Sequence, residues 1–145
     1  MDVKFYYNAP DRLRAACAIT AKAVAQGRKI VVFAPDHGAA QQYDMLLWAA
    51  QPLSFVPHVM ATSPLVDRTP VVMAQALSNL PHDDVLINLA DDLPTGYERF
   101  KLLVEIVSGD DTGRDAARQR WRFYKEHQHV VQAYDLAKDR ARTPS

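Results

Sequence analysis

The sequence predicts a single-domain α/β fold with a mostly parallel sheet and helices on both of its faces. Three observations support this class. The chain has 145 residues, the size of one ordinary domain. Its content of 48% hydrophobic and 23% charged residues is that of a globular protein and not of a disordered one. Strand-like and helix-like segments alternate from the N-terminus, which is typical of α/β layers.

The first fifty residues contain two strand-helix pairs. Strands are expected over residues 3–7 and 29–33, and helices over residues 13–24 and 38–50. Asp11 is placed to cap the first helix, and Gly27 is placed to end it. The second strand is rich in β-branched residues, which predicts burial on both faces of a parallel sheet.

The rest of the chain starts with a proline-rich stretch and ends with a helix and a strand. Four prolines between residues 51 and 70 predict a surface loop with short extended pieces. Strands are expected over 71–73, 85–89 and 101–107, a helix over 112–127 and an edge strand over 129–136, although 97–107 also fits helical spacing. The domain is expected to span residues 1–137, followed by a flexible tail, residues 138–145.

Composition restricts the possible partners and compartments. Seventeen basic residues offset seventeen acidic ones, whereas nucleic-acid-binding proteins usually carry a basic excess, so any contact with DNA is expected to be local or indirect. The single cysteine has no partner for an intrachain disulfide, and no apolar run is long enough to span a membrane. These features predict a soluble, cytoplasmic protein.

Sequence motifs for catalysis or for cofactor binding are weak. The turns NAPDRL and APDHGAA lack the glycines of a nucleotide-binding loop, and the five histidines lack metal-ligand spacing. His127 and His129 are expected to be a solvent-exposed pair, and the three Asp doublets are expected to cap helices and turns. Cys17 is expected to be an inert residue of the core. We therefore predict no catalytic residue, no metal and no cofactor.

Charge is distributed unevenly along the chain, and the basic excess gathers on one predicted helix. Residues 82–111 carry a net charge of −6 and residues 114–142 a net charge of +4. At 100° per residue, five side chains of the helix over 112–127 lie within an arc of about 100°: Arg114, Arg118, Trp121, Arg122 and Lys125. Like charges at this spacing repel one another, and no acidic residue is expected within the stripe.

The stripe has a structural and a functional interpretation. It is either a solvated face whose indole packs against its neighbours, or a binding site for an anionic partner. Guanidinium groups beside an aromatic ring suit an acidic peptide with a bulky apolar residue as well as they suit phosphates. A second aromatic segment, with Trp48, Phe55 and Val56, either anchors a loop to the core or forms a contact with another protein.

Several segments together resemble one known family. They are LLW at 46–48, SFVPH at 54–58, LINL at 86–89 and RQRWRFYK at 118–125, preceded by the N-terminal FYY. In order and spacing they resemble the chi subunit of bacterial DNA polymerase III, and the likeness covers nearly the whole chain. The resemblance implies a Rossmann-like α/β protein without catalytic activity that belongs to the clamp-loader assembly.

The resemblance also implies two partners and two surfaces. The acidic C-terminal tail of single-stranded-DNA-binding protein would bind at Val107, Arg118, Trp121, Arg122 and Lys125. The psi subunit would bind around Trp48, Phe55 and Val56. Two alternatives stay open from the residues alone: a direct single-stranded nucleic-acid-binding protein that uses the same arginines, and a small α/β nucleotide-binding enzyme with Asp36, His37, Asp91 and Asp92 at the strand ends.

Overall fold

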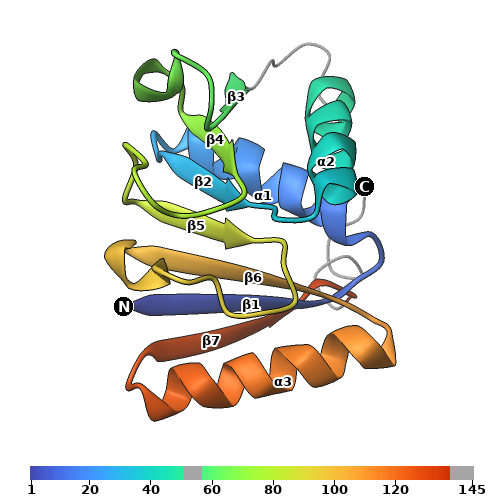
Figure 1. Ribbon diagram of the computed structural model, residues 1–145. Helices are drawn as coiled ribbons and strands as arrows, with labels where there is room; N and C mark the ends of the chain where they lie inside the picture. Colours follow the sequence, from blue (N-terminus) through green and yellow to red (C-terminus); the bar gives the residue numbers. More distant parts are fainter. Residues whose placement is uncertain (51–56, 138–145) are drawn as a thin grey trace.

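The computed structural model describes residues 1–50 and 57–137 of the chain. In this part, seven parallel strands form one sheet in the order β3-β4-β2-β5-β6-β1-β7 (Figure 1). The strands are β1 (Asp2–Ala9), β2 (Ile30–Phe33), β3 (His58–Met60), β4 (Val71–Ala74), β5 (Val85–Asn88), β6 (Leu102–Ser108) and β7 (Val130–Asp135). The helices are α1 (Arg12–Ala25), α2 (His37–Ala50) and α3 (Asp111–Glu126), with short 3-10 turns η1 (Val66–Arg68) and η2 (Tyr97–Arg99).

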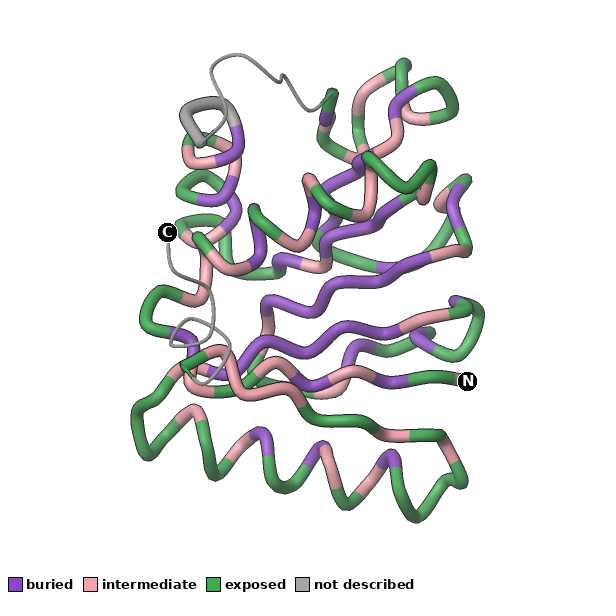
Figure 2. The backbone as a smooth tube through the Cα atoms, turned by 180° about the vertical axis from the view of Figure 1, so that it is seen from behind, coloured by how far each residue is buried: buried purple, intermediate pink, exposed green. Residues whose placement is uncertain are grey.

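The sheet is covered on both faces, which confirms the predicted fold class. Helices α1 and α2 pack on one face, and α3 packs on the other under β6, β1 and β7 (Figure 1). Successive residues of a strand point to opposite faces, so Ile30 and Val32 join the core beneath α1 and α2 while Val31 joins the core on the face that carries α3. Each such fully buried side chain contributes roughly 1.5–3 kcal/mol. Figure 2 shows the central strands buried and the outer side of α3 exposed.

Local signals in the sequence set the ends of the first helix as expected. The Asp11 carboxylate accepts a hydrogen bond from the backbone N–H of Arg14, which satisfies one of the free donors at the start of α1. Gly27 follows the helix with a φ of 79°, a conformation that glycine adopts without strain. The helix, predicted over residues 13–24, therefore begins and ends within one residue of the predicted bounds.

The ambiguous segment before β6 is a 3-10 turn followed by a strand. Residues Tyr97–Arg99 form η2, and Leu102–Ser108 form β6, so the strand interpretation of residues 101–107 is confirmed and the helical one is wrong. The last strand, β7, pairs in parallel with β1 at the edge of the sheet, as the prediction of an edge strand required. The proposed tail, residues 138–145, lies outside the described residues.

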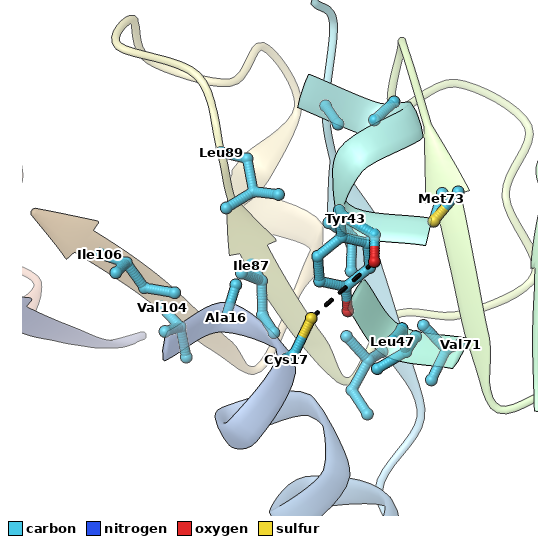
Figure 3. Packing of buried hydrophobic residues seen from close by; sticks show 14 of the residues in the cluster. Ala16, Cys17, Tyr43, Leu47, Val71, Met73, Ile87, Leu89, Val104 and Ile106 are labelled. Carbon is cyan, nitrogen blue, oxygen red and sulfur yellow. Dashed lines mark hydrogen bonds between the residues drawn. The ribbon is translucent and has the colours of Figure 1, made fainter. Parts of the chain in front are cut away.

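The lone cysteine is part of the core between α1 and α2. Cys17 is buried and its Sγ lies 3.8 Å from the carbonyl oxygen of Tyr43 (Figure 3). Burial raises the pKa of Cys17 to about 11, so the thiol stays protonated at neutral pH. An inert structural role is therefore the role that this environment supports.

The Asp doublets have more varied roles than the predicted caps. Asp110 does cap a helix, α3. The prediction is wrong for Asp84 and Asp91, which form ion pairs with distant arginines: Asp84 with Arg28 at 2.6 Å and Asp91 with Arg12 at 3.2 Å. Because each partner lies more than fifty residues away, these pairs connect segments that a local pattern cannot associate.

The pair of Arg28 and Asp84 predicts a pH-dependent contribution to stability. Both carboxylate oxygens accept from the guanidinium, and the N–H of Lys29 adds a third donor, so the pKa of Asp84 lies below its ordinary value. A lowered pKa in the folded state stabilises the protein above the unfolded value of about 4, and this stabilisation is lost as the pH falls further. Asp84→Asn should cost about 1 kcal/mol at pH 7 and less at pH 3, as measured by urea unfolding.

The neighbouring Asp83 supplies the control. Its side chain is exposed, and Asp83→Asn should leave the free energy of unfolding within about 0.5 kcal/mol of the original value at both pH values. Equal effects of the two substitutions would contradict a stabilising role for the ion pair.

Candidate functional site

Helix α3 starts directly after β6, and its first turn is built around one glycine. Asp110 Oδ1 accepts a hydrogen bond from the N–H of Gly113 at 2.6 Å. A Cβ atom on residue 113 would lie 2.7 Å from Ser108 Oγ and 2.9 Å from Asp110 Oδ1, so a larger residue would displace the cap. The Gly113 N–H and the Ser108 hydroxyl hold the pKa of Asp110 below its ordinary value. The cap thus sets where α3 begins.

The two sides of α3 differ strongly in polarity. Ala117, Arg120 and Tyr124 are buried against the sheet. The cationic side chains of the predicted stripe are exposed, and they are Arg114, Arg118, Arg122 and Lys125. Trp121 lies between the two sides and is half-buried, with its ring packed edge-on against Phe5 at a centroid distance of 5.1 Å. The indole is therefore anchored below while part of it stays accessible beside the cations.

A pocket of about 340 Å³ opens next to this indole, between α3 and the strands β1, β6 and β7. Its lining comprises Phe5, Tyr7, Asn8, Val107, Arg114, Ala117, Arg118, Trp121 and Ala133. Phe5 and Ala133 are direct cross-strand neighbours on β1 and β7. The walls are thus largely apolar, and two guanidinium-bearing side chains stand at the α3 side.

Five residues were predicted to bind the acidic tail of a partner protein. The structure brings three of them into this lining: Val107, Arg118 and Trp121. The other two are not part of the lining. Lys125 Nζ lies 5.5 Å from the centroid of the Trp121 ring, and Arg122 is exposed one helical turn beyond Arg118. Both cations therefore extend the charged surface along α3, away from the pocket.

Sequence reasoning missed the residues that other strands contribute to the pocket. Phe5 and Tyr7 alternate along β1 and point to the α3 face, a spacing that was visible in the sequence. Nothing local indicated that β1 lies between β6 and β7, which is what brings these rings and Ala133 beside α3.

The expectation that no acidic residue interrupts the cationic stripe is wrong. Asp115 Oδ1 lies 3.6 Å from Arg118 Nη1, and both side chains are about 70% exposed. Such a surface pair contributes less than about 1 kcal/mol and leaves most of the guanidinium donors available. Within residues 1–50 and 57–137, Arg114, Arg122 and Lys125 form no ion pair. The stripe therefore keeps a net positive charge at the mouth of the pocket.

The second predicted surface, around Trp48, Phe55 and Val56, lies only partly within the described residues. Trp48 lies in the last turn of α2, and its side chain is outside the described part of the structure. Phe55 and Val56 also lie outside the described residues. Their assignment to a psi-facing surface stays a prediction.

The histidines and acids considered for metal or nucleotide chemistry do not converge on one site. His127 is exposed, but His129 is half-buried with Nε2 3.0 Å from the Tyr97 hydroxyl, so the expected exposed pair is wrong. The described residues contain no cluster of three or more groups suited to hold a metal ion. None of the helices in the same part of the chain is long and apolar enough to cross a membrane.

A cavity of about 580 Å³ does lie at the carboxyl ends of β2, β4 and β5, where nucleotides bind in related architectures. Of the four residues considered for an enzyme, only Asp92 lines it. Asp36 instead accepts from the N–H of Ala39 in the first turn of α2, and Asp91 pairs with Arg12. An acidic side chain at this cavity repels phosphate, so the nucleotide-enzyme alternative gains no support.

Comparison with known proteins identifies the family. The family model for the DNA polymerase III chi subunit, HolC, matches residues 1–132. A DNA polymerase III subunit chi of Pseudomonas aeruginosa is 30% identical over 125 residues, which cover 86% of this chain and 87% of that protein. Those of Escherichia coli and Haemophilus influenzae are 30% and 29% identical, each over about three quarters of both chains. The chain therefore belongs to the DNA polymerase III chi subunit family.

Proposed function

We propose that this protein is a non-catalytic accessory subunit that links the clamp loader, through the psi subunit, to single-stranded-DNA-binding protein during DNA replication. The observation that supports the second link is the apolar pocket at Trp121 and Val107, bordered by the exposed cations of α3. A pocket of this size accepts one bulky apolar side chain, and the cations suit the acidic residues that precede it in a tail.

Binding would combine two kinds of contact. Arg118, Arg122 and Lys125 attract the acidic side chains and the terminal carboxylate of the tail. Trp121 and Val107 contact its last apolar side chains. Exposed charge contacts contribute up to about 1 kcal/mol each and are screened over about 8 Å at physiological salt. Affinity should therefore be modest and should fall as salt rises.

The two partners would occupy different sides of the molecule. Helix α2, which carries Trp48 in its last turn, lies on the face of the sheet opposite to α3 (Figure 1). The segment with Phe55 and Val56 follows α2 in the sequence. A psi subunit bound there and a tail bound at α3 can thus be held at the same time, as a bridging subunit requires.

A peptide titration tests the tail site directly. An acidic peptide that ends in an aromatic residue should bind at least tenfold more tightly than the same peptide without that residue, because burying such a side chain contributes about 1.5–3 kcal/mol. Calorimetry at low and at physiological salt measures both affinities. Equal binding of the two peptides would contradict a role for the pocket.

The same titration separates this proposal from direct nucleic-acid binding. If the arginines of α3 bound phosphates, single-stranded DNA would bind without the peptide, with a steep dependence on salt, and the peptide would not need its aromatic residue. The proposed function expects weak binding of bare DNA and competition between DNA and peptide for the same cations.

A further inference from the structure

A carboxylate is buried in the middle of the apolar interface between the sheet and α3. Leu103, Glu105 and Val107 alternate along β6 and face the helix, and Glu105 has no exposed surface. An apolar residue of similar volume would usually be as stabilising or more so at such a position. The buried charge at this point therefore suggests a role beyond packing.

The carboxylate is bound by two side chains of α3. Glu105 Oε2 accepts from Arg120 Nε at 3.1 Å and from the Tyr124 hydroxyl at 2.6 Å. Arg120 and Tyr124 are one helical turn apart, so both bonds act on the same side of the helix. Burial raises the pKa of Glu105, and the adjacent Arg120 opposes that shift. Hydrogen bonds are directional, and two of them from one turn restrict both the rotation and the sliding of α3.

The same carboxylate is tied to the sheet and to the loop after β5. Asn88 Nδ2 donates to both Glu105 oxygens at 3.1 Å, and it also donates to the carbonyl oxygen of Asp92 at 3.2 Å. Arg120 Nη1 donates to the carbonyl oxygen of Asp91. Every buried polar side-chain atom in the described residues has a partner, so the network is complete. A complete network holds one arrangement more strongly than a partial one.

The network lies in the same row of the sheet as the floor of the pocket. Asn88, Glu105, Phe5 and Ala133 are successive cross-strand neighbours on β5, β6, β1 and β7. Phe5 in turn supports the Trp121 ring at 5.1 Å and the Tyr124 ring at 5.9 Å. A shift of α3 over this row would change the distances from Trp121 and Arg118 to Phe5 and Val107, and so the shape of the pocket.

We propose that Glu105 is a positioning residue, which fixes α3 on the sheet through Arg120 and Tyr124 and thereby gives the Trp121 pocket the shape that recognises the tail. This inference rests on the proposed function for its binding readout. Apolar packing also holds α3, through the buried ring of Tyr124, but it is not directional. The inward position one turn before Trp121 in the pocket lining is the small Ala117, so the directional bonds to Glu105 add restraint next to the pocket.

The test replaces the charged pair by apolar residues and follows stability and the pocket separately. Glu105→Leu combined with Arg120→Met removes both charges together, so neither charge is left buried and unpaired. The Tyr124 hydroxyl and the Asn88 amide lose their Glu105 acceptor, so the protein should stay folded with a modest loss in its free energy of unfolding. Binding of the acidic peptide should nevertheless fall about tenfold, since a loosened pocket loses complementarity. A stable double variant with unchanged affinity would overturn the proposal.

Two further variants keep the test decisive if the double variant fails to fold. Tyr124→Phe removes only the hydrogen bond from the hydroxyl to Glu105 and should lower the affinity for the acidic peptide about threefold. Tyr43→Phe is the matched control, because it removes the 2.6 Å contact with Thr20 Oγ1 in the core of the opposite face. It should leave peptide binding unchanged, and equal effects of the two would refute the positioning role.

A readout without peptide separates this inference from the proposed function. In a Trp48→Phe background Trp121 is the only indole, and its N–H gives one NMR signal. Glu105→Leu/Arg120→Met and Tyr124→Phe should broaden or split that signal, and Tyr43→Phe should not. If the original protein bound no acidic peptide, the proposed function would be wrong, but the indole signal would still test whether Glu105 positions α3. If the signal were unaltered both in Glu105→Leu/Arg120→Met and in Tyr124→Phe, the positioning role would be refuted.

Discussion

Arg118→Glu is expected to weaken binding of the acidic tail peptide about 30-fold without unfolding the protein. The substitution removes one charge contact and introduces one repulsion, each worth up to about 1 kcal/mol at an exposed position. Arg118 lines the pocket and its side chain is 71% exposed, so the fold does not depend on it. Calorimetry measures the affinity, and thermal unfolding verifies the fold.

Arg14→Glu is a closely matched control for this prediction. Arg14 pairs with Asp11 at i,i+3 as Arg118 pairs with Asp115, and its side chain is 70% exposed. It lies on α1, on the face of the sheet opposite to α3. The control should change the affinity by no more than about twofold, through long-range charge alone. An equal loss in both variants would mean that net charge, and not the α3 site, controls binding.

Trp121→Ala is expected to reduce the affinity for the same peptide by about 30-fold or more. The indole forms a wall of the pocket and rests on Phe5, so its loss removes apolar contact with the ligand and leaves the wall open. Buried aromatic residues at the centre of an interface commonly contribute at least about 2 kcal/mol to binding. Binding should become similar for peptides with and without the terminal aromatic residue, which calorimetry can measure.

Phe123→Ala controls for the loss of an aromatic ring from the same helix. Phe123 is half-buried, and its ring stacks on His127 at 3.9 Å instead of lining the pocket. This substitution should lower stability while the affinity stays nearly constant. If Trp121→Ala also affected only stability, the indole would be a packing residue and the proposed tail site would be wrong.

The periodicity of the sequence was sufficient to predict helix α3, which forms one side of the site. The cations of α3 recur at three- and four-residue spacing, and the helix presents them on its exposed side as that spacing predicted. The acid at Asp115 was in the sequence too, but whether its side chain approaches Arg118 depends on rotamers that a helical projection does not contain.

The lining of the pocket could not be predicted in the same way. Val107 was assigned to it through the family resemblance, whereas Phe5 and Ala133 lie more than a hundred residues apart and meet only because β1 and β7 pair. Arg120 shows the same difficulty. In the sequence it is one of the bases in the C-terminal third, and in the fold it is a buried cation neutralised by Glu105.

Short-range patterns were thus enough to predict the α/β class, the ends of α1 and the exposed cations of α3. Hydrophobic periodicity and helix caps involve residues within a few positions of each other, so they can be recognised in the sequence. Strand order, the partners of Asp84 and Glu105, and the apolar side of the pocket depended on contacts between residues far apart in the chain. Those contacts follow from how the strands pair and how the helices cover the sheet, since a buried charge or an aromatic ring takes its neighbours from every element packed around it.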